Sequence, residues 1–243
     1  MGYIEDMSGY GVVEDKVSIN DYVIAVEKQG EIVHYYRYVN NKVKVSKTIV
    51  KPARFELVPF YPVMLPIRFT NYILVKLSKK ILVPSKEEVT IYVKIPVNLA
   101  VYAYGRHRRF KIIDVFSINK IKYALYGIPD RGVVARYWRS NPNLDLPEPT
   151  MGEAIALVNI RNRYDGWVEI GKILLNAQIL RLYYIPKSWT AYTQVVIMAV
   201  NSRTTATIYY GRRIEANAKP ILDPPAFKPP RIPAKTEMLW GLK

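Results

Sequence analysis

Short segments in which apolar and polar residues alternate constrain the fold of this chain more than any other feature. In residues 17–27, for example, Val17, Ile19 and Val23 share one side of a two-residue repeat. Successive side chains of a β-strand point to opposite faces, so this alternation predicts strands with one mostly apolar face. Similar segments, rich in Val, Ile, Tyr and Thr, recur at 31–39, 42–50, 72–83, 89–95, 99–104, 111–118, 122–126, 133–138, 154–160, 167–174, 179–185, 193–200 and 204–210.

Turn residues bound these segments, and no amphipathic helical repeat lies between them. The pairs Asn40-Asn41 and Asn201-Ser202 are typical of tight connections between strands. Many short strands at this spacing favour two-layered antiparallel architectures. We therefore predict an all-β fold with an antiparallel β-sandwich-like architecture.

Proline-rich segments suggest how the chain is divided. Residues 141–150 have loop composition throughout, so we expect an N-terminal β half over 1–140 and a C-terminal half over 151–215 packed against it. Residues 216–243 form a tail with many prolines, which we expect to be extended and excluded from regular sheet pairing. The tail ends in three apolar residues that we expect to dock, on a neighbouring subunit or back along the same sandwich, with the tryptophan as anchor: Met238, Leu239 and Trp240. A homo-oligomer held by the tail is therefore a hypothesis.

Positive charge is concentrated in one part of the sequence. The formal net charge is +16 on 243 residues, and acids balance bases over residues 1–60 but not over 104–140. A concentration of positive charge attracts polyanions, and arginine interleaved with aromatic residues suits phosphates and stacked bases. The candidate ligand-binding residues are Arg106, Arg108, Arg109, Arg131, Arg136, Trp138 and Arg139. In the competing interpretation the aromatic residues fill the core and the bases keep a thermophile-like protein in solution.

Several classes of functional site lack support in the sequence. The chain has no cysteine, and neither His34 nor His107 has an acid at metal-ligand spacing, so we expect no metal and no cofactor. Neither a phosphate-binding glycine loop nor a dinucleotide fingerprint occurs. Asp114 interrupts an apolar strand segment and is the one weak catalytic candidate; the catalytic residues are otherwise unknown. A hydrolase-like enzyme acting on a small anionic substrate near Asp114 and neighbouring arginines is therefore an alternative function.

Exposed aromatic residues raise a second alternative, a carbohydrate-binding β-sandwich. Trp138, Trp167 and Trp189 are candidates, and the turn at 164–167 combines aromatic and polar residues as a sugar-stacking site does. For Trp167 we favour a core position after a turn. No apolar segment reaches the ~18–20 residues that a bilayer requires, and no signal peptide is recognisable, so we expect a soluble, cytoplasmic protein.

Three segments in the middle of the chain carry a resemblance. They are residues 113–117, 122–127 and 132–138, supported by 62–66, 70–72 and 95–97. The chain resembles a family of archaeal proteins known only as a domain of unknown function, over most of its length except the proline-rich tail. The resemblance implies an archaeal source and brings no activity, cofactor or catalytic residue. We therefore predict a non-enzymatic binding or assembly module whose basic surface takes a nucleic acid, another polyanion or an acidic protein.

Overall fold

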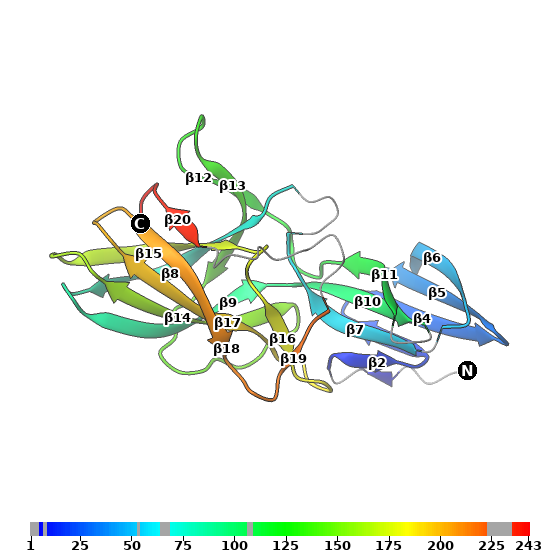
Figure 1. The fold of residues 1–243 in the computed structure, drawn as a ribbon. Coiled ribbons are helices and arrows are strands. Elements are labelled where there is room, and N and C mark those ends of the chain that lie inside the picture. The colour runs from blue at the N-terminus through cyan, green and yellow to red at the C-terminus, as the bar shows by residue number, and fades with distance from the viewer. Residues whose placement is uncertain (1–4, 7–8, 53, 64–68, 106–108, 223–234) are drawn as a thin grey trace.

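The computed structural model describes residues 5–6, 9–52, 54–63, 69–105, 109–222 and 235–243. These residues form β-strands joined by turns and loops, with no helix among them, so the all-β prediction is confirmed. It follows that no helix in the described ranges could cross a membrane. Figure 1 shows the strands gathered in two lobes, and two sheets build each lobe.

The first lobe contains sheets A and B, which lie on the right in Figure 1. Sheet A has the order β1 (Glu5–Asp6), β3 (Lys16–Ile19), β4 (Tyr22–Gln29), β5 (Ile32–Val39) and β6 (Lys42–Val50). Sheet B has the order β11 (Phe110–Phe116), β10 (Asn98–Tyr104), β7 (Arg54–Phe60) and β2 (Gly11–Val13). The strands β6 and β11 are therefore edge strands of their respective sheets.

The second lobe contains sheets C and D. Sheet C has the order β12 (Tyr123–Tyr126), β13 (Val133–Ser140), β8 (Tyr72–Val83) and β15 (Val168–Asn176). Sheet D has the order β19 (Lys219–Pro220), β16 (Leu182–Tyr184), β17 (Ala191–Val200), β14 (Glu153–Asn162) and β9 (Glu88–Pro96), and β18 (Ala206–Arg213) links β17 to β20 (Thr236–Met238). Most pairs are antiparallel; β1–β3, β8–β13 and β14–β17 are parallel.

The chain passes between the lobes repeatedly. It leaves the first lobe after β7, returns at the junction of β9 and β10, where Val97 alone separates the two strands, and leaves again after β11. As a result, β8 and β9, which precede the connection expected at 141–150, pair with β15 and β14, which follow it in the sequence. A division of the chain into halves at 141–150 stays a prediction.

The two lobes also meet at the start of β2. The Tyr10 N–H donates to the Ser188 carbonyl at 3.0 Å, and the Lys187 N–H donates to the Tyr10 carbonyl at 2.7 Å. A Cβ at Gly9 would lie 1.9 Å from the Ser188 nitrogen, so a side chain at residue 9 would push the two segments apart. Buried residues of both lobes belong to one hydrophobic cluster, in which Tyr10 is completely buried.

The C-terminal segment pairs with sheet D in two places. β19 pairs with β16, and the proline-free β20 pairs with β18. The expectation that prolines exclude the whole tail from sheet pairing is therefore wrong, because Pro220 occupies an edge, where its missing N–H costs little. Met238 is completely buried, Trp240 is half-buried and Leu239 is exposed, so residues 235–243 lie back along the same chain. Residues 223–234 lie outside the described part, and assembly through the tail stays a prediction.

Candidate anion-binding groove

The edge strands β6 and β11 flank the same side of the first lobe, at the top of that lobe in Figure 1. The Lys47 ammonium donates to the Ile113 carbonyl and so connects the two edges. Between them lies a cavity of about 630 Å³, lined on one side by residues 47–52 and on the other by residues 103–105, 109–111 and 113. Two sheet edges and the β10–β11 hairpin thus form one groove.

Cationic side chains gather in this groove. Lys47 and Lys51 come from the β6 side, and Arg109 and Lys111 come from the β11 side. Lys51 also pairs with Glu31 at 3.0 Å, but both side chains are more than half exposed, so water screens this pair. The described lining residues include no Asp or Glu. The groove therefore carries excess positive charge.

Two aromatic residues, Tyr104 and Phe110, are among the lining residues. The Phe110 ring stacks on Tyr102 with 5.0 Å between ring centroids and an interplanar angle of 16°. Beside it, the Arg54 guanidinium carbon lies 4.4 Å from the centroid of the Tyr104 ring, and burial raises the pKa of Tyr104. The Tyr102 hydroxyl donates to the Leu222 carbonyl at 2.8 Å, so this ring cluster lies on the face of sheet B that is turned away from sheet A.

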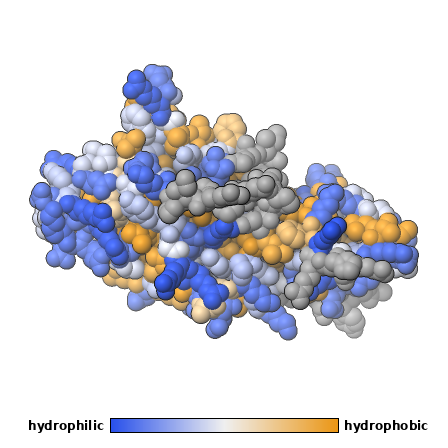
Figure 2. Space-filling model, in the orientation of Figure 1, coloured by the Kyte–Doolittle hydropathy of each residue, from blue (hydrophilic) through white to orange (hydrophobic). Residues whose placement is uncertain are grey.

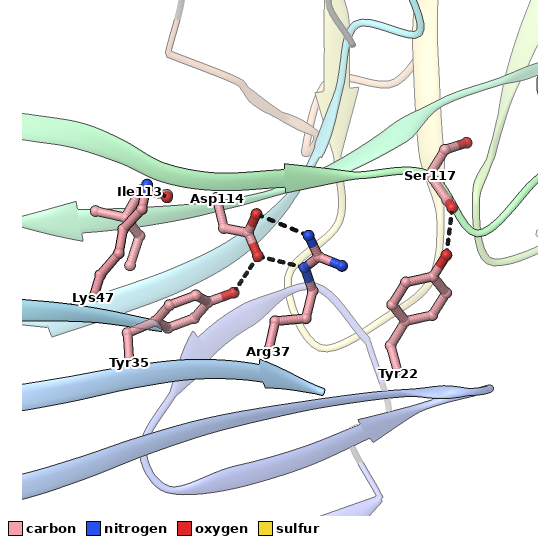
Figure 3. Close-up of polar contacts among 7 residues, drawn as sticks. All are labelled: Tyr22, Tyr35, Arg37, Lys47, Ile113, Asp114 and Ser117. Atoms are coloured by element: carbon pink, nitrogen blue, oxygen red, sulfur yellow. Dashed lines mark hydrogen bonds and ion pairs between the residues drawn. The ribbon is translucent and has the colours of Figure 1, made fainter. Parts of the chain in front are cut away.

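Asp114 lies behind the groove and connects the two sheets (Figure 3). Its Oδ2 accepts hydrogen bonds from the Arg37 Nε at 2.6 Å and from the Tyr35 hydroxyl at 2.7 Å, and its Oδ1 lies 3.4 Å from an Arg37 nitrogen. Burial, followed by the neighbouring carboxylate, raises the pKa of Tyr35. Both carboxylate oxygens are therefore occupied.

The contacts of Asp114 can be compared with the enzyme hypothesis. An enzyme of the proposed kind would hold Asp114 in a cleft beside two arginines. Within the described chain one arginine, Arg37, pairs with Asp114, and the ion pair is buried between β5 and β11. Arg37 also stacks over the Phe116 ring at 5.0 Å. The geometry is that of a structural cross-link that holds sheet A against sheet B.

The candidate arginines do not form one surface. Arg109 lines the groove, whereas Arg131 is exposed in the turn of the β12–β13 hairpin, whose projecting tip is hydrophilic in Figure 2. Arg139 is exposed and lines a different, polar pocket of about 520 Å³ in the second lobe, together with Lys94 and Asn141. Arg106 and Arg108 lie outside the described residues.

Arg136 is fully buried and does not reach the surface. Its guanidinium donates to the Pro62 carbonyl, to Asn98 Oδ1 at 2.8 Å and to Ser117 Oγ at 3.1 Å. Burial lowers the pKa of Arg136 to about 10, so the side chain stays charged at neutral pH. Its three acceptors lie where the chain crosses between the lobes, which makes Arg136 a structural link. Its neighbour Trp138 is half-buried, and the indole Nε1 has no hydrogen-bond partner in the described part of the chain.

Three groove cations, Lys47, Lys51 and Lys111, were not among the candidate residues, although Lys111 belongs to the basic segment 104–140. Lys47 and Lys51 belong to the region where acids and bases cancel, so a charge count over residues 1–60 conceals them. The available signal was local: lysine recurs beside valine along 42–47, as expected for a charged edge strand. Trp167 also differs from expectation, because it is 63% exposed and the preferred core position is wrong.

Comparison with known proteins places the chain in a family. A family model described as a protein of unknown function, DUF432, matches residues 9–237. A search of curated proteins and a search of solved structures each gave no match. The resemblance to an uncharacterised family is thus confirmed, whereas an archaeal source stays a prediction. Because the match covers nearly the whole chain, the chain belongs to the DUF432 family.

Proposed function

We propose that this protein is a non-enzymatic binding module that holds an anionic partner in the groove between β6 and β11. The observation that carries the proposal is the gathering of Lys47, Lys51, Arg109 and Lys111 around one cavity whose described lining contains no carboxylate. Cations collected in a concave surface concentrate the electric field and raise the local concentration of anions.

The shape of the groove favours an extended partner. Its β6 side is formed by six consecutive residues, 47–52. Residues 47–50 belong to β6, and at about 3.3 Å per residue this strand part of the wall is roughly 10 Å long, which exceeds the size of a single phosphate or carboxylate group. In sequence, Arg106 and Arg108 add two cations to the connection between β10 and β11. A polymer carrying several negative charges therefore fits better than a small anion.

Binding of polyanions tests this proposal. Fluorescently labelled heparin, poly-L-glutamate and an oligothymidylate should be titrated with the protein at about 50 and 300 mM salt, with anisotropy as the readout. We expect at least one probe to bind with a micromolar Kd, and its affinity to fall steeply as salt rises. The combined substitutions Lys51→Gln, Arg109→Gln and Lys111→Gln should weaken that binding at least tenfold.

A matched variant separates the groove from net charge alone. Lys79, Arg203 and Arg212 are exposed in the second lobe, and replacing these three with glutamine removes the same amount of charge. We expect less than a twofold change in this control. Equal losses in both triple variants, or no binding of any probe by the unaltered protein, would contradict the proposal.

One observation favours a second candidate function, carbohydrate binding. Trp167 is 63% exposed, and the adjacent turn holds an ion pair of 2.6 Å between Lys86 and Asp165. An exposed indole with polar neighbours can stack on a pyranose ring. Titration with a panel of oligosaccharides should then quench tryptophan fluorescence, and Trp167→Ala should abolish the quenching. An unchanged spectrum with every sugar would remove this candidate.

A further inference from the structure

The strand β6 has a free side in the described part of the fold. It is the last strand of sheet A and pairs with β5 through a register that matches Val33 to Ile49. The Lys51 N–H donates to the Glu31 carbonyl at 2.7 Å, which sets the alternation of the ladder. The odd-numbered residues Lys47 and Ile49 therefore direct their backbone N–H and C=O groups toward β5. Ser46 lies at an alternate position and directs its N–H and C=O away from β5.

In the described part of the chain, this free edge lacks two common protections against further pairing, a proline and a covering segment. Proteins commonly block an edge with proline, with a covering segment or with charged side chains. β6 contains no proline, is exposed along most of its length, and leaves Val43 and Val50 51% and 66% exposed. Its protection consists of three lysines, Lys42, Lys44 and Lys47, and of a β-bulge at the start of the strand, after which the pairing runs regularly from Val45 to Val50.

The lysines select the type of strand that can pair with β6. A second copy of β6 in antiparallel pairing would bring lysines toward lysines, which is unfavourable. A strand with carboxylates would instead place opposite charges beside β6. On β6, Lys47 and every second residue from it face the groove, where Lys51 and Lys111 also lie. Ser46 and Val50, on the alternate positions, face the outer surface of sheet A.

We propose that the anionic partner is an acidic polypeptide segment that adds to β6 as an extended strand, an inference that rests on the proposed function. Main-chain hydrogen bonds to the outward groups of β6 hold the segment, and its alternate side chains determine specificity. Acidic side chains on the groove side meet Lys47, Lys51 and Lys111. Apolar side chains on the opposite side pack beside Val50 on the outer face of β6.

An octapeptide of alternating glutamate and valine, labelled with fluorescein, is the probe. We expect a micromolar Kd by anisotropy at about 50 mM salt. The same peptide methylated on alternate backbone nitrogens keeps its charge but cannot donate to β6, and should bind at least tenfold more weakly. A lysine–valine octapeptide should not bind.

A variant of the protein tests the same contact from the other side. Ser46→Pro removes an outward N–H and leaves the ladder to β5 in place, so it should weaken peptide binding at least tenfold. Ser46→Ala is the matched control and should bind within twofold of the unaltered protein. Circular dichroism establishes whether Ser46→Pro is folded, and the methylated peptide provides the test on the unaltered protein if it is not.

The outcomes separate this inference from the proposed function. Equal binding of the plain and methylated peptides would overturn strand addition and leave the basic groove intact as a binding site. An oligothymidylate that binds more than tenfold tighter than the glutamate–valine peptide would make nucleic acid the partner and also overturn strand addition. Failure of every anionic probe would overturn both proposals.

Discussion

Replacing Asp114 with asparagine should strongly destabilise the first lobe. The substitution keeps the side-chain volume and an oxygen that can accept from Tyr35, but removes the charge that faces Arg37 at 2.6 Å. The two side chains are 6% and 13% exposed, so the remaining guanidinium is nearly buried without a counter-charge. Breaking a buried pair in this way costs about 3–5 kcal/mol. Because the Arg37 side chain keeps some solvent contact and its stacking on Phe116, we expect about 3 kcal/mol.

Urea unfolding followed by tryptophan fluorescence measures this loss. The unfolding midpoint should fall with little change in m-value, and the thermal midpoint should drop by roughly 6–12 °C for a chain of this size. Arg37→Met should cost a similar amount, because it leaves the Asp114 carboxylate buried and unpaired. The double variant should be no less stable than either single variant, since it removes both charges together.

Strict additivity in that double-mutant cycle, or a loss below about 0.5 kcal/mol for Asp114→Asn, would refute the structural role. A stable Asp114→Asn protein that had lost turnover of an anionic substrate would instead favour the enzyme hypothesis.

Three further predictions follow from the buried contacts. Arg136→Lys should lower the free energy of unfolding by about 2–4 kcal/mol in urea titrations, since a compact ammonium cannot occupy the positions of both guanidinium nitrogens that donate to the three acceptors; an unchanged midpoint would contradict this. Burial raises the pKa of Tyr184 and of Tyr210 from 10 to about 12, so the two neutral hydroxyls should contribute fully to the stability of the fold below pH 10. This contribution should be lost as the pH rises toward 12, and thermal midpoints measured from pH 9 to 12 check the direction. Met238→Ala should cost about 2–4 kcal/mol because the side chain is completely buried, whereas Leu239→Ala, its exposed neighbour, should cost under about 0.5 kcal/mol; equal effects would mean that β20 is not docked in solution.

The strands could be predicted from the sequence because alternation is a local property. The strand Lys42–Val50 was expected with these bounds, and the strand Val133–Ser140 was expected at 133–138, since a β-strand exposes alternate side chains to different surroundings. Burial was less predictable. Asn98–Tyr104 is buried at every residue, because β10 lies inside sheet B, and its position between β11 and β7 depends on segments far away in the sequence.

The candidate site was only partly predictable, because its members come from distant parts of the chain. The sequence indicated Arg109 through the local excess of positive charge over 104–140. It did not indicate that Lys47 and Lys51 join Arg109, because that contact exists only once sheet A packs against sheet B. Arg136 belongs to the same basic segment, yet the crossing of the chain between the lobes buries it. Local patterns thus determined that the chain forms strands and carries excess positive charge, whereas packing between distant strands decided which charges are exposed, which are buried and which meet in one groove.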